Sequence, residues 1–403
     1  MLLNRNMNLH CKTRLKQAAL CLTAFLVAWI IWLPCLHLVF RKPLSNFYQE
    51  KGVSPKARQL AARHIQLWTD PALLQVELRK MRTSNAEWDF MGRSFLVWSL
   101  ANMGLRDPAT RVRYLPVIDK IIKETLTVEK QDGIYAFLMP YAKDRPYRIK
   151  PARSLFIDGE IALMMGARRM LEEHPVYAQE MNERLSSIEQ TWRANACMAS
   201  ESYPDECWTF DHAVALAAFK VNDRLTGTDH SALCKKWIAV AREKLIDKNT
   251  GLLISSYQTD GAPLDGPEGS TIWMVAHCLE VVDETLARDQ YRRARKELGR
   301  ITLGFGYGKE WPKSWDGPRD IDSGVVIPGF EVSAGSSGMA FIAASTFHDW
   351  EYLQALASTL DMAAFPLVKN NQLKYCASNQ VGDAALLYAA VLGPLWEGIK
   401  YER

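Results

Sequence analysis

The chain has 403 residues, of which 48% are hydrophobic and 23% charged, proportions normal for a globular protein with a sizeable core. Its net charge is +4, but six cations fall within the first 42 residues, which hold no acidic residue. The rest of the chain therefore carries about −2, has no basic footprint for nucleic acid, and is not expected to bind it.

The first 55 residues divide into three parts. Residues 1–17 form a short basic segment, and residues 18–40 carry no formal charge over a length that spans a bilayer as a helix. No small-x-small cleavage site follows, so we predict an uncleaved single-pass transmembrane anchor. Four cations precede the span and two follow it, which favours a cytoplasmic N-terminus and an extracytoplasmic catalytic part. Residues 41–55 are predicted to be a linker.

Residues 56–403 show amphipathic segments of helical period without a convincing run of strands. Helices are predicted near 56–68, 90–105, 111–129, 154–171, 175–195, 208–224, 231–246, 270–283, 286–302, 334–347, 350–362 and 381–395. Paired in order, they predict an all-α domain, an (α/α)6 toroid in which six helical hairpins form a closed double ring. The alternative is an α-solenoid with decorated loops, for which we expect a clearer repeat consensus.

Six long, chemically rich segments each precede a helix. They are 83–92, 149–160, 201–212, 256–271, 314–338 and 375–384. The connections 106–110 and 172–175 are short and plain. This alternation predicts that six inner helices begin at one end of the toroid, where their N-termini favour negative charge and the long loops form the mouth of an active site.

Cysteine and histidine spacing gives no metal signal. Cys11, Cys21 and Cys35 belong to the anchor region, and the other five cysteines are an odd number without CxxC spacing. The eight histidines form no HxxxH or HExxH pattern. We expect no metal site.

The stretch from 201 to 283 resembles the linalool dehydratase/isomerase family. The residues that carry the resemblance are YPDECWTFDHAVALAA (203–218), NDRLTGTDH (222–230), EKLIDKNTGLLISSYQTDGAP (243–263) and STIWMVAHCLEVVD (270–283), with weaker matches at 98–108, 158–170 and 372–388. The resemblance implies an (α/α)6 fold, no cofactor, and interconversion of a tertiary allylic terpene alcohol, its primary isomer and a dehydrated triene. A homo-oligomeric ring is a further implication.

The chain departs from that family at its acid–base residues. Ser202 and Asp211 stand where the family has two active-site cysteines, and Glu160 stands where it has a histidine. Gly269, next to Glu268, replaces a tyrosine. The resemblance therefore implies a divergent member in which carboxyl groups replace thiol and imidazole.

Four acids are the predicted catalytic residues: Asp211, Glu160, Glu268 and Asp89. An Asp beside Trp208 and Phe210 in a partly dry site has a raised pKa and acts as an acid at neutral pH. The alternative for Asp211 is a buried acid paired with an arginine. For Glu160 and Asp89, the alternative is an acid placed at a helix start for dipole reasons alone.

Nine further residues, beside or within the long segments, are predicted to bind substrate. They are Trp88, Tyr203, Trp208, Phe210, His212, Trp273, Asp322, Glu331 and Tyr375. Taken singly, each aromatic residue is also explained as core. As a set around one mouth they suit a carbocation, because ring faces stabilise positive charge, and they equally suit stacking on a sugar ring.

Two enzyme classes follow from this pattern. The first is a membrane-anchored, cofactor-independent lyase or isomerase that acts by carbocation chemistry on a small hydrophobic alcohol or alkene, such as a terpenoid, by dehydration, isomerisation or cyclisation. The second is an (α/α)6 glycan-active hydrolase or lyase with paired carboxylates. A cell-surface binding module is a third interpretation, but a binder has little need for so many inward acids.

Overall fold

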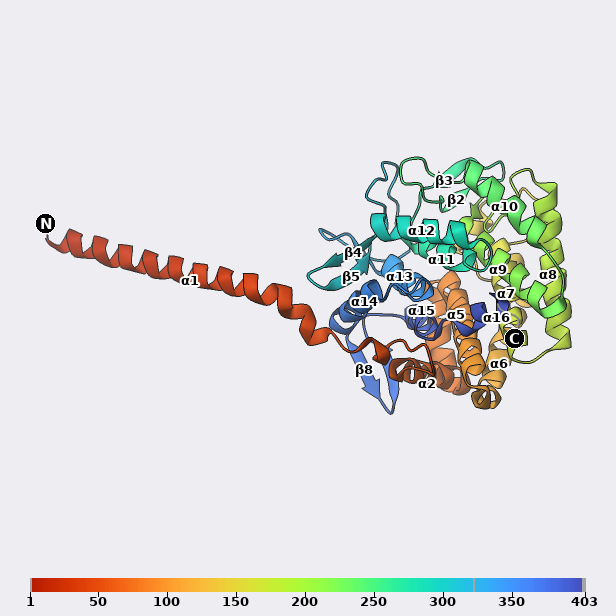
Figure 1. Ribbon diagram of the computed structural model, residues 1–403, viewed down its shortest axis with the longest axis horizontal. Helices are drawn as coiled ribbons and strands as arrows, with labels where there is room; N and C mark the ends of the chain where they lie inside the picture. Colours follow the sequence, from red (N-terminus) through yellow and green to blue (C-terminus); the bar gives the residue numbers. More distant parts are fainter. Residues whose placement is uncertain (1, 322, 401–403) are drawn as a thin grey trace.

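The computed structural model describes residues 2–321 and 323–400, with side chains from Thr13 onward. Its long first helix, α1 (Leu2–Phe40), leaves the helical body as an isolated rod (Figure 1). The stretch Thr13–Asn46 is long and apolar enough to cross a membrane, judged by length and composition. The predicted basic segment and anchor thus form one continuous helix.

The body is the predicted toroid. Its inner ring consists of α5 (Ala86–Arg106), α7 (Leu155–Leu171), α9 (Thr209–Thr226), α11 (Gly269–Leu279), α13 (Ala334–Thr346) and α15 (Gln380–Val391). Each of these helices packs against the next, and α15 packs against α5, so the ring closes. This closure excludes the solenoid.

An outer ring surrounds the inner one. It consists of α2 (Pro55–Thr69), α6 (Arg111–Asp132), α8 (Pro175–Ala194), α10 (Ser231–Lys244), α12 (Glu284–Glu297) and α14 (Trp350–Ala363). Burial explains the two layers, since α7 buries 16 of its 17 residues whereas α12 buries only a stripe that includes Leu286, Tyr291 and Ala294. All twelve predicted helices are confirmed.

The inner helices run parallel, so their N-termini meet at one end. A Cβ on Gly92, near the start of α5, would lie 3.5 Å from Val381 at the start of α15. A Cβ on Gly159, near the start of α7, would lie 3.4 Å from Ala215 on α9. The long segments therefore all lie at this end, which we call the mouth.

The opposite end of the toroid is closed by α16 (Pro394–Lys400). The Trp396 ring stacks on His277 of α11 with centroids 4.7 Å apart, and its Nε1–H donates to the His277 carbonyl. The His277 ring in turn bonds to Tyr388 of α15 (2.9 Å) and Thr346 of α13 (2.7 Å). The end of the toroid opposite the mouth is therefore filled by packed side chains.

The expectation of no strands was wrong for the mouth segments. Small antiparallel sheets there comprise β1 (Cys207–Trp208), β2 (Ser256–Tyr257) and β3 (Pro263–Asp265); β4 (Gly299–Thr302), β5 (Phe305–Gly308), β6 (Val326–Ile327) and β7 (Val332–Ser333); and β8 (Pro366–Lys369) with β9 (Gln372–Tyr375). Strands of two to four residues are too short for an alternating pattern to stand out in the sequence.

Short helical turns complete the chain. They are η1 (Leu44–Asn46), α3 (Pro71–Leu73), the π-helical η2 (Leu74–Leu78), α4 (Arg79–Ser84), η3 (Pro108–Thr110), η4 (Gly133–Tyr135) and η5 (Pro140–Lys143). The predicted linker is not free, because Phe47 is buried against Phe341 (centroids 5.1 Å apart) and Tyr48 against Trp350. Residues 47 and 48 thus belong to the packed body.

Close packing around Gly269 at the mouth leads to a prediction about the stability of the fold. A Cβ on Gly269 would lie 2.3 Å from the Lys309 carbonyl oxygen, a backbone atom that cannot rotate away. We expect Gly269→Ala to destabilise the protein by about 2 kcal/mol or more, as overpacking does. Gly338, a helical glycine of α13 with open space around it, is the control, and Gly338→Ala should be neutral or stabilising. Equal thermal unfolding temperatures for both variants would contradict the packing.

Candidate active site

Five of the six inner helices begin with a buried acid: Asp89 on α5, Asp158 on α7, Asp211 on α9, Glu268 at the N-cap of α11 and Asp383 on α15. Helix N-termini stabilise negative charge, so each position is favourable on its own. The ring closure brings these helix starts, which are distant in sequence, to one end of the molecule. The mouth is therefore acidic.

Two of these acids are held by arginines. Asp158 accepts from Arg153 (2.6 Å) and from the buried Arg184 (2.7 Å). Asp89, predicted to be catalytic, pairs with Arg93 (3.0 Å) and lies 3.8 Å from Arg82. Ion pairs of this kind suit a structural anchor, because both carboxyl groups already have charged partners within the protein.

Glu160 is different because it is buried without a cation. It is 1% exposed in α7, and burial raises its pKa to about 8, with a smaller lowering by a hydrogen bond from Ser94 and a further rise from the charge of Asp211. Its Oε2 has no hydrogen-bond partner among the described residues. Buried polar atoms are seldom left without a partner, so this oxygen is free to meet a ligand.

Asp211 is the counterpart of Glu160 on the neighbouring helix α9. It is buried, and burial raises its pKa to about 7 against a hydrogen bond from the Ser202 hydroxyl, which lowers it. The Ser202 Oγ also accepts from the Trp208 N–H (3.3 Å). The starts of α7 and α9 touch, since a Cβ on Gly159 would lie 3.5 Å from the Asp211 carbonyl. Two of the four predicted catalytic acids, Glu160 and Asp211, thus lie on helices that are in contact near their starts.

Neutral, poorly solvated groups surround this pair. Burial raises the pKa of Cys278 and Tyr388, and the charge of Glu160 raises both further. Burial likewise raises the pKa of Tyr203 and Tyr257, with a small contribution from Asp211. The two carboxyl groups therefore lie among phenols and a thiol that stay protonated at neutral pH.

Glu268, another of the four predicted catalytic acids, is buried at the N-cap of α11. Its backbone N–H donates to the Ser255 hydroxyl (2.9 Å). It adjoins Gly269, whose lack of a side chain lets α11 approach the Lys309 carbonyl. It lies at the mouth, as predicted. The raised pKa values of Glu160 and Asp211 are due mainly to burial, and the charge of Glu268 does not contribute to them.

His212 stabilises the loop that precedes α9. It is fully buried, and its Nδ1–H donates to the Trp208 carbonyl (2.7 Å), so Nε2 accepts from the Ser200 N–H (3.2 Å) and the Tyr257 hydroxyl (3.2 Å). Burial lowers its pKa to about 4. Both ring nitrogens already have protein partners, so His212 fixes the loop before α9 and is not placed to bind substrate as predicted.

Two predicted aromatic residues face away from the pair. Trp273 lies between Tyr291 of α12 and Tyr352 of α14, with centroids about 6 Å away, and so packs between the two rings. Tyr375 is fully buried on β9 beside Lys56 of the outer helix α2. Both predictions overlooked that an inner-ring segment has an outward face as well as an inward one.

The other predicted aromatic residues lie at or near the mouth. Tyr203 is buried, stacks on Tyr141 (5.1 Å) and accepts from the Met139 N–H (3.0 Å). Phe210 is buried, while Trp88 and Trp208 are half-buried. Their role in binding a substrate stays a prediction.

The long loop before α13 places its acids differently from the prediction. Glu331 is exposed and pairs with Lys309 and, at 3.8 Å, with Arg319, and the Lys309 contact lowers its pKa. It is thus not part of the buried site. Asp322 lies outside the described residues.

Three polar residues at the pair were not among the predicted site residues: Ser94, Cys278 and Tyr388. Each lies on an inner helix that is almost wholly buried. A polar residue within such an apolar helix is the feature of the sequence that could have identified them. Among the described residues, no group of three His, Cys, Asp or Glu is arranged to hold a metal ion.

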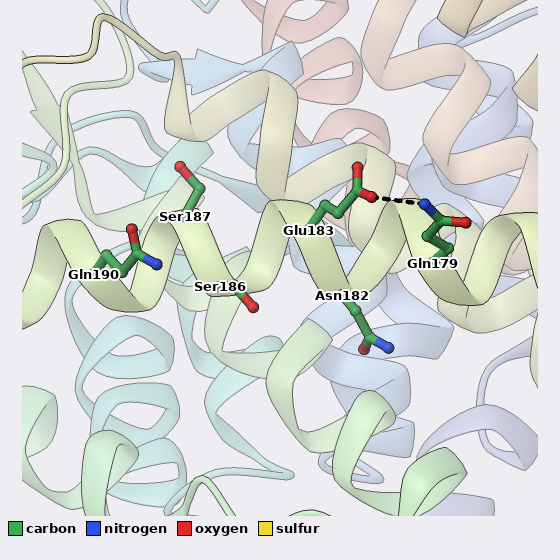
Figure 2. A pocket seen from close by; sticks show the side chains of 6 residues that line it. All are labelled: Gln179, Asn182, Glu183, Ser186, Ser187 and Gln190. Atoms are coloured by element: carbon green, nitrogen blue, oxygen red, sulfur yellow. Dashed lines mark hydrogen bonds between the residues drawn. The ribbon is translucent and has the colours of Figure 1, made fainter.

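A hollow on the surface of the outer ring lies on α8, away from the pair. It is lined by Gln179, Asn182, Glu183, Ser186, Ser187 and Gln190, all on one polar face of the outer helix α8 (Figure 2). Its one drawn contact joins Gln179 to Glu183 on the same helix. Because a single helix lines it, this hollow is open surface.

Comparison with known proteins finds no matching family model. Among solved structures, the chain is similar to the α-1,6-mannanase of Salegentibacter sp. HEL1_6, at 12% identity over 76% of this chain and 89% of that one (TM-score 0.48). It is also similar to a family 76 glycoside hydrolase from a bovine Bacteroides thetaiotaomicron strain (12%; 91% and 77%; 0.48) and to a family 105 glycoside hydrolase of C. acetobutylicum ATCC 824 (13%; 85% and 99%; 0.45). At these identities and TM-scores the likeness does not extend to the reaction.

Proposed function

We propose that this chain is an acid–base enzyme in which Glu160 donates a proton and Asp211 accepts one. The observation that carries the proposal is their pairing, two buried carboxyl groups on neighbouring helices with pKa values near 8 and 7. Burial raises both pKa values toward neutral pH, the range in which a carboxyl group serves as a general acid or base. We assign the acid role to Glu160 because the charge of Asp211 raises its pKa further.

The substrate class that this site suits best is a hydrophobic alcohol or alkene, such as a terpenoid. Glu160 would protonate the hydroxyl group, which leaves as water, and Asp211 would remove a proton from a carbon next to the resulting allylic cation. Burial of both carboxyl groups, at 1% and 6% exposure, keeps water from capturing the cation. The resemblance to the linalool dehydratase/isomerase family at 201–283 leads to the same chemistry.

The N-terminal helix supports this choice of substrate. We propose that α1 spans a membrane once, with the N-terminus in the cytoplasm and the toroid outside, because more cations precede the apolar stretch than follow it. An apolar substrate concentrates in a bilayer, so a tethered enzyme meets it there. Assembly into a homo-oligomeric ring stays a prediction, to be checked by light scattering.

A glycan is the second candidate substrate, favoured by tryptophans at the mouth. Trp311 and Trp315 stack with centroids 6.1 Å apart and are only half-buried, as are Trp88 and Trp208. Exposed tryptophan faces suit sugar rings, and the pair Glu160 and Asp211 would flank a glycosidic bond as acid and base. The solved structures named above include enzymes of this class.

A substrate panel separates the two candidates. The full chain in lipid nanodiscs is incubated with terpene alcohols and polyenes and, separately, with α-linked oligosaccharides, and products are identified by mass spectrometry. The double variant Glu160→Gln/Asp211→Asn serves as the blank. We expect turnover of the isoprenoid set alone. Turnover of the oligosaccharides alone would favour the glycan-active enzyme instead. No turnover of either set would contradict the proposed acid–base enzyme.

A further inference from the structure

A buried glutamate next to Ser202 plays no part in the proposed proton transfers. Glu201 is 1% exposed, and its carboxyl group accepts hydrogen bonds from three backbone N–H groups. Its Oε1 accepts from Arg148 (3.0 Å) and Asp205 (2.6 Å), and its Oε2 accepts from Ile149 (2.7 Å). Arg148 and Ile149 belong to the segment that leads into α7, whereas Asp205 belongs to the segment that leads into α9. One side chain therefore joins the two segments of the mouth that lead to the acid–base pair.

The start of α7 also contacts the backbone of residues 201 and 202. Leu155, the first residue of α7, donates its N–H to the Glu201 carbonyl (2.9 Å). The hydroxyl group of Ser154, the N-cap residue of α7, donates to the Ser202 carbonyl (2.7 Å). Both the backbone and the side chain of Glu201 are thus bonded to the segment before α7, so a change at Glu201 shifts one segment relative to the other.

Residues 202–206 form a tight turn that the Glu201 carboxyl group contacts. The Ser202 N–H donates to the Glu206 carbonyl (2.8 Å), and the Glu206 N–H donates to the Tyr203 carbonyl (2.9 Å). Asp205, within the turn, has a φ of 67°, in the left-handed region that residues other than glycine seldom adopt. A residue persists in this region when its surroundings hold it there, and the bond from the Asp205 N–H to Glu201 is such a restraint.

The turn fixes Ser202, whose hydroxyl group contacts Asp211. The Ser202 backbone is bonded on both sides, to Glu206 through its N–H and to Ser154 through its carbonyl. The Ser202 Oγ accepts from the Trp208 N–H (3.3 Å). The hydrogen bond from the Ser202 hydroxyl to the Asp211 carboxyl group lowers the pKa of Asp211 against the larger rise due to burial. The contacts of Glu201 therefore lead, through Ser202, to one of the two acids.

We infer that Glu201 is a positioning residue for the acid–base pair. Its carboxyl group fixes the loop before α9 against the loop before α7, and so keeps the Ser202 hydroxyl on Asp211. Glu201 acts through Ser202 and the two loops and does not itself take part in proton transfer. Reacting groups need such support, because a displacement of about 1 Å can slow a reaction about 100-fold. The inference rests on the proposed function, since it concerns the same pair.

Glu310 offers a matched control at another part of the mouth. It is also buried, at 2% exposure, and it also accepts hydrogen bonds that join the starts of two inner helices. Its donors are the Ser270 N–H (3.1 Å) and hydroxyl (2.6 Å) on α11 and the Ser333 hydroxyl at the N-cap of α13. Glutamine at either position replaces an accepting oxygen with an NH2 group that only donates, so both variants should lose stability. Only Glu201→Gln should alter Asp211.

The pKa of Asp211 is a readout that a merely structural role of Glu201 would not change. The full chain in lipid nanodiscs is titrated by infrared spectroscopy, and each protein is compared with the same protein carrying Asp211→Asn, so that the difference isolates the Asp211 band. In Glu201→Gln the pKa of Asp211 should rise from about 7 by about 0.5 to 1, because the hydrogen bond from Ser202 that lowers it is weakened. Ser202→Ala should give the same rise, and Glu310→Gln should give none. With a panel substrate, Glu201→Gln should lower kcat by about 10- to 100-fold and change KM far less.

An unchanged pKa of Asp211 in Glu201→Gln, with a loss of unfolding temperature like that of Glu310→Gln, would overturn the inference. Glu201→Asp keeps a carboxyl group on a shorter side chain and should give a smaller rise. If Glu201→Gln does not fold, an unchanged pKa of Asp211 in Glu201→Asp overturns the inference in its place. The titration needs no substrate. Failure of the substrate panel therefore counts against the proposed function, and failure of the titration counts against the role of Glu201.

Discussion

Replacing Glu160 with glutamine, or Asp211 with asparagine, should lower kcat by about 100- to 10,000-fold, the usual contribution of a general acid or base. Both substitutions keep the shape of the side chain and remove only its proton chemistry. Because the two carboxyl groups act in one step, the double variant should be little worse than either single variant. The measurement is turnover of whichever panel substrate the wild type converts.

The matched control is Asp383→Asn. Asp383 is also a buried acid at the start of an inner helix, and burial raises its pKa to about 7, but it accepts from the Tyr375 N–H on the outer side of α15. Its substitution should leave kcat within a few-fold of wild type. In the wild type, kcat should fall on both sides of neutral pH, because burial raises the pKa of both carboxyl groups toward neutrality. Wild-type rates for Glu160→Gln and Asp211→Asn would remove both residues from the mechanism.

The second large effect concerns stability against pH. A carboxyl group whose pKa is raised by folding keeps its proton where the unfolded chain has lost it, so its contribution is complete below the unfolded pKa and is lost as the pH rises through the folded one. For Glu160 this window runs from about 4.5 to about 8. Each pKa unit corresponds to about 1.4 kcal/mol, so the wild type should lose several kcal/mol across the window.

Glu160→Gln should therefore lose less stability than the wild type as the pH rises. The free energy of unfolding, measured in urea at several pH values, should converge for the two proteins below about pH 4.5 and diverge in favour of the variant up to about pH 8. Glu183→Gln, on the exposed face of α8, is the control and should follow the wild type throughout. Parallel curves for Glu160→Gln and wild type would mean that burial does not raise the pKa of Glu160.

The sequence predicted the toroid well because its helices carry a strong signal. Outer helices such as α12 show an apolar stripe at helical spacing, and the contrast between short and long connections predicted which helix ends share the mouth. Asp211 was predicted because it lies one turn inside its helix, beyond the capping positions, and Glu160 because it stands where the linalool dehydratase/isomerase family has a histidine. Ring closure then explains why these two residues meet.

Other features depend on the direction of a side chain, which helix position alone does not give. Trp273 and Tyr375 were predicted for the mouth, yet one packs between the two rings and the other against α2. His212 directly follows Asp211 but points away from it, because consecutive helical residues differ by about 100° around the axis. Asp89 was predicted to be catalytic, but Arg93, one helical turn later, pairs with it.

Infrared spectroscopy of the carboxyl groups tests the central claim most directly. The account predicts that wild-type protein at pH 7 shows a protonated carboxylic C=O band that is absent from Glu160→Gln and that disappears from the wild type as the pH rises through about 8. Identical difference spectra for wild type and Glu160→Gln at pH 7 would mean that Glu160 is already ionised, and a carboxylate there has no proton to donate.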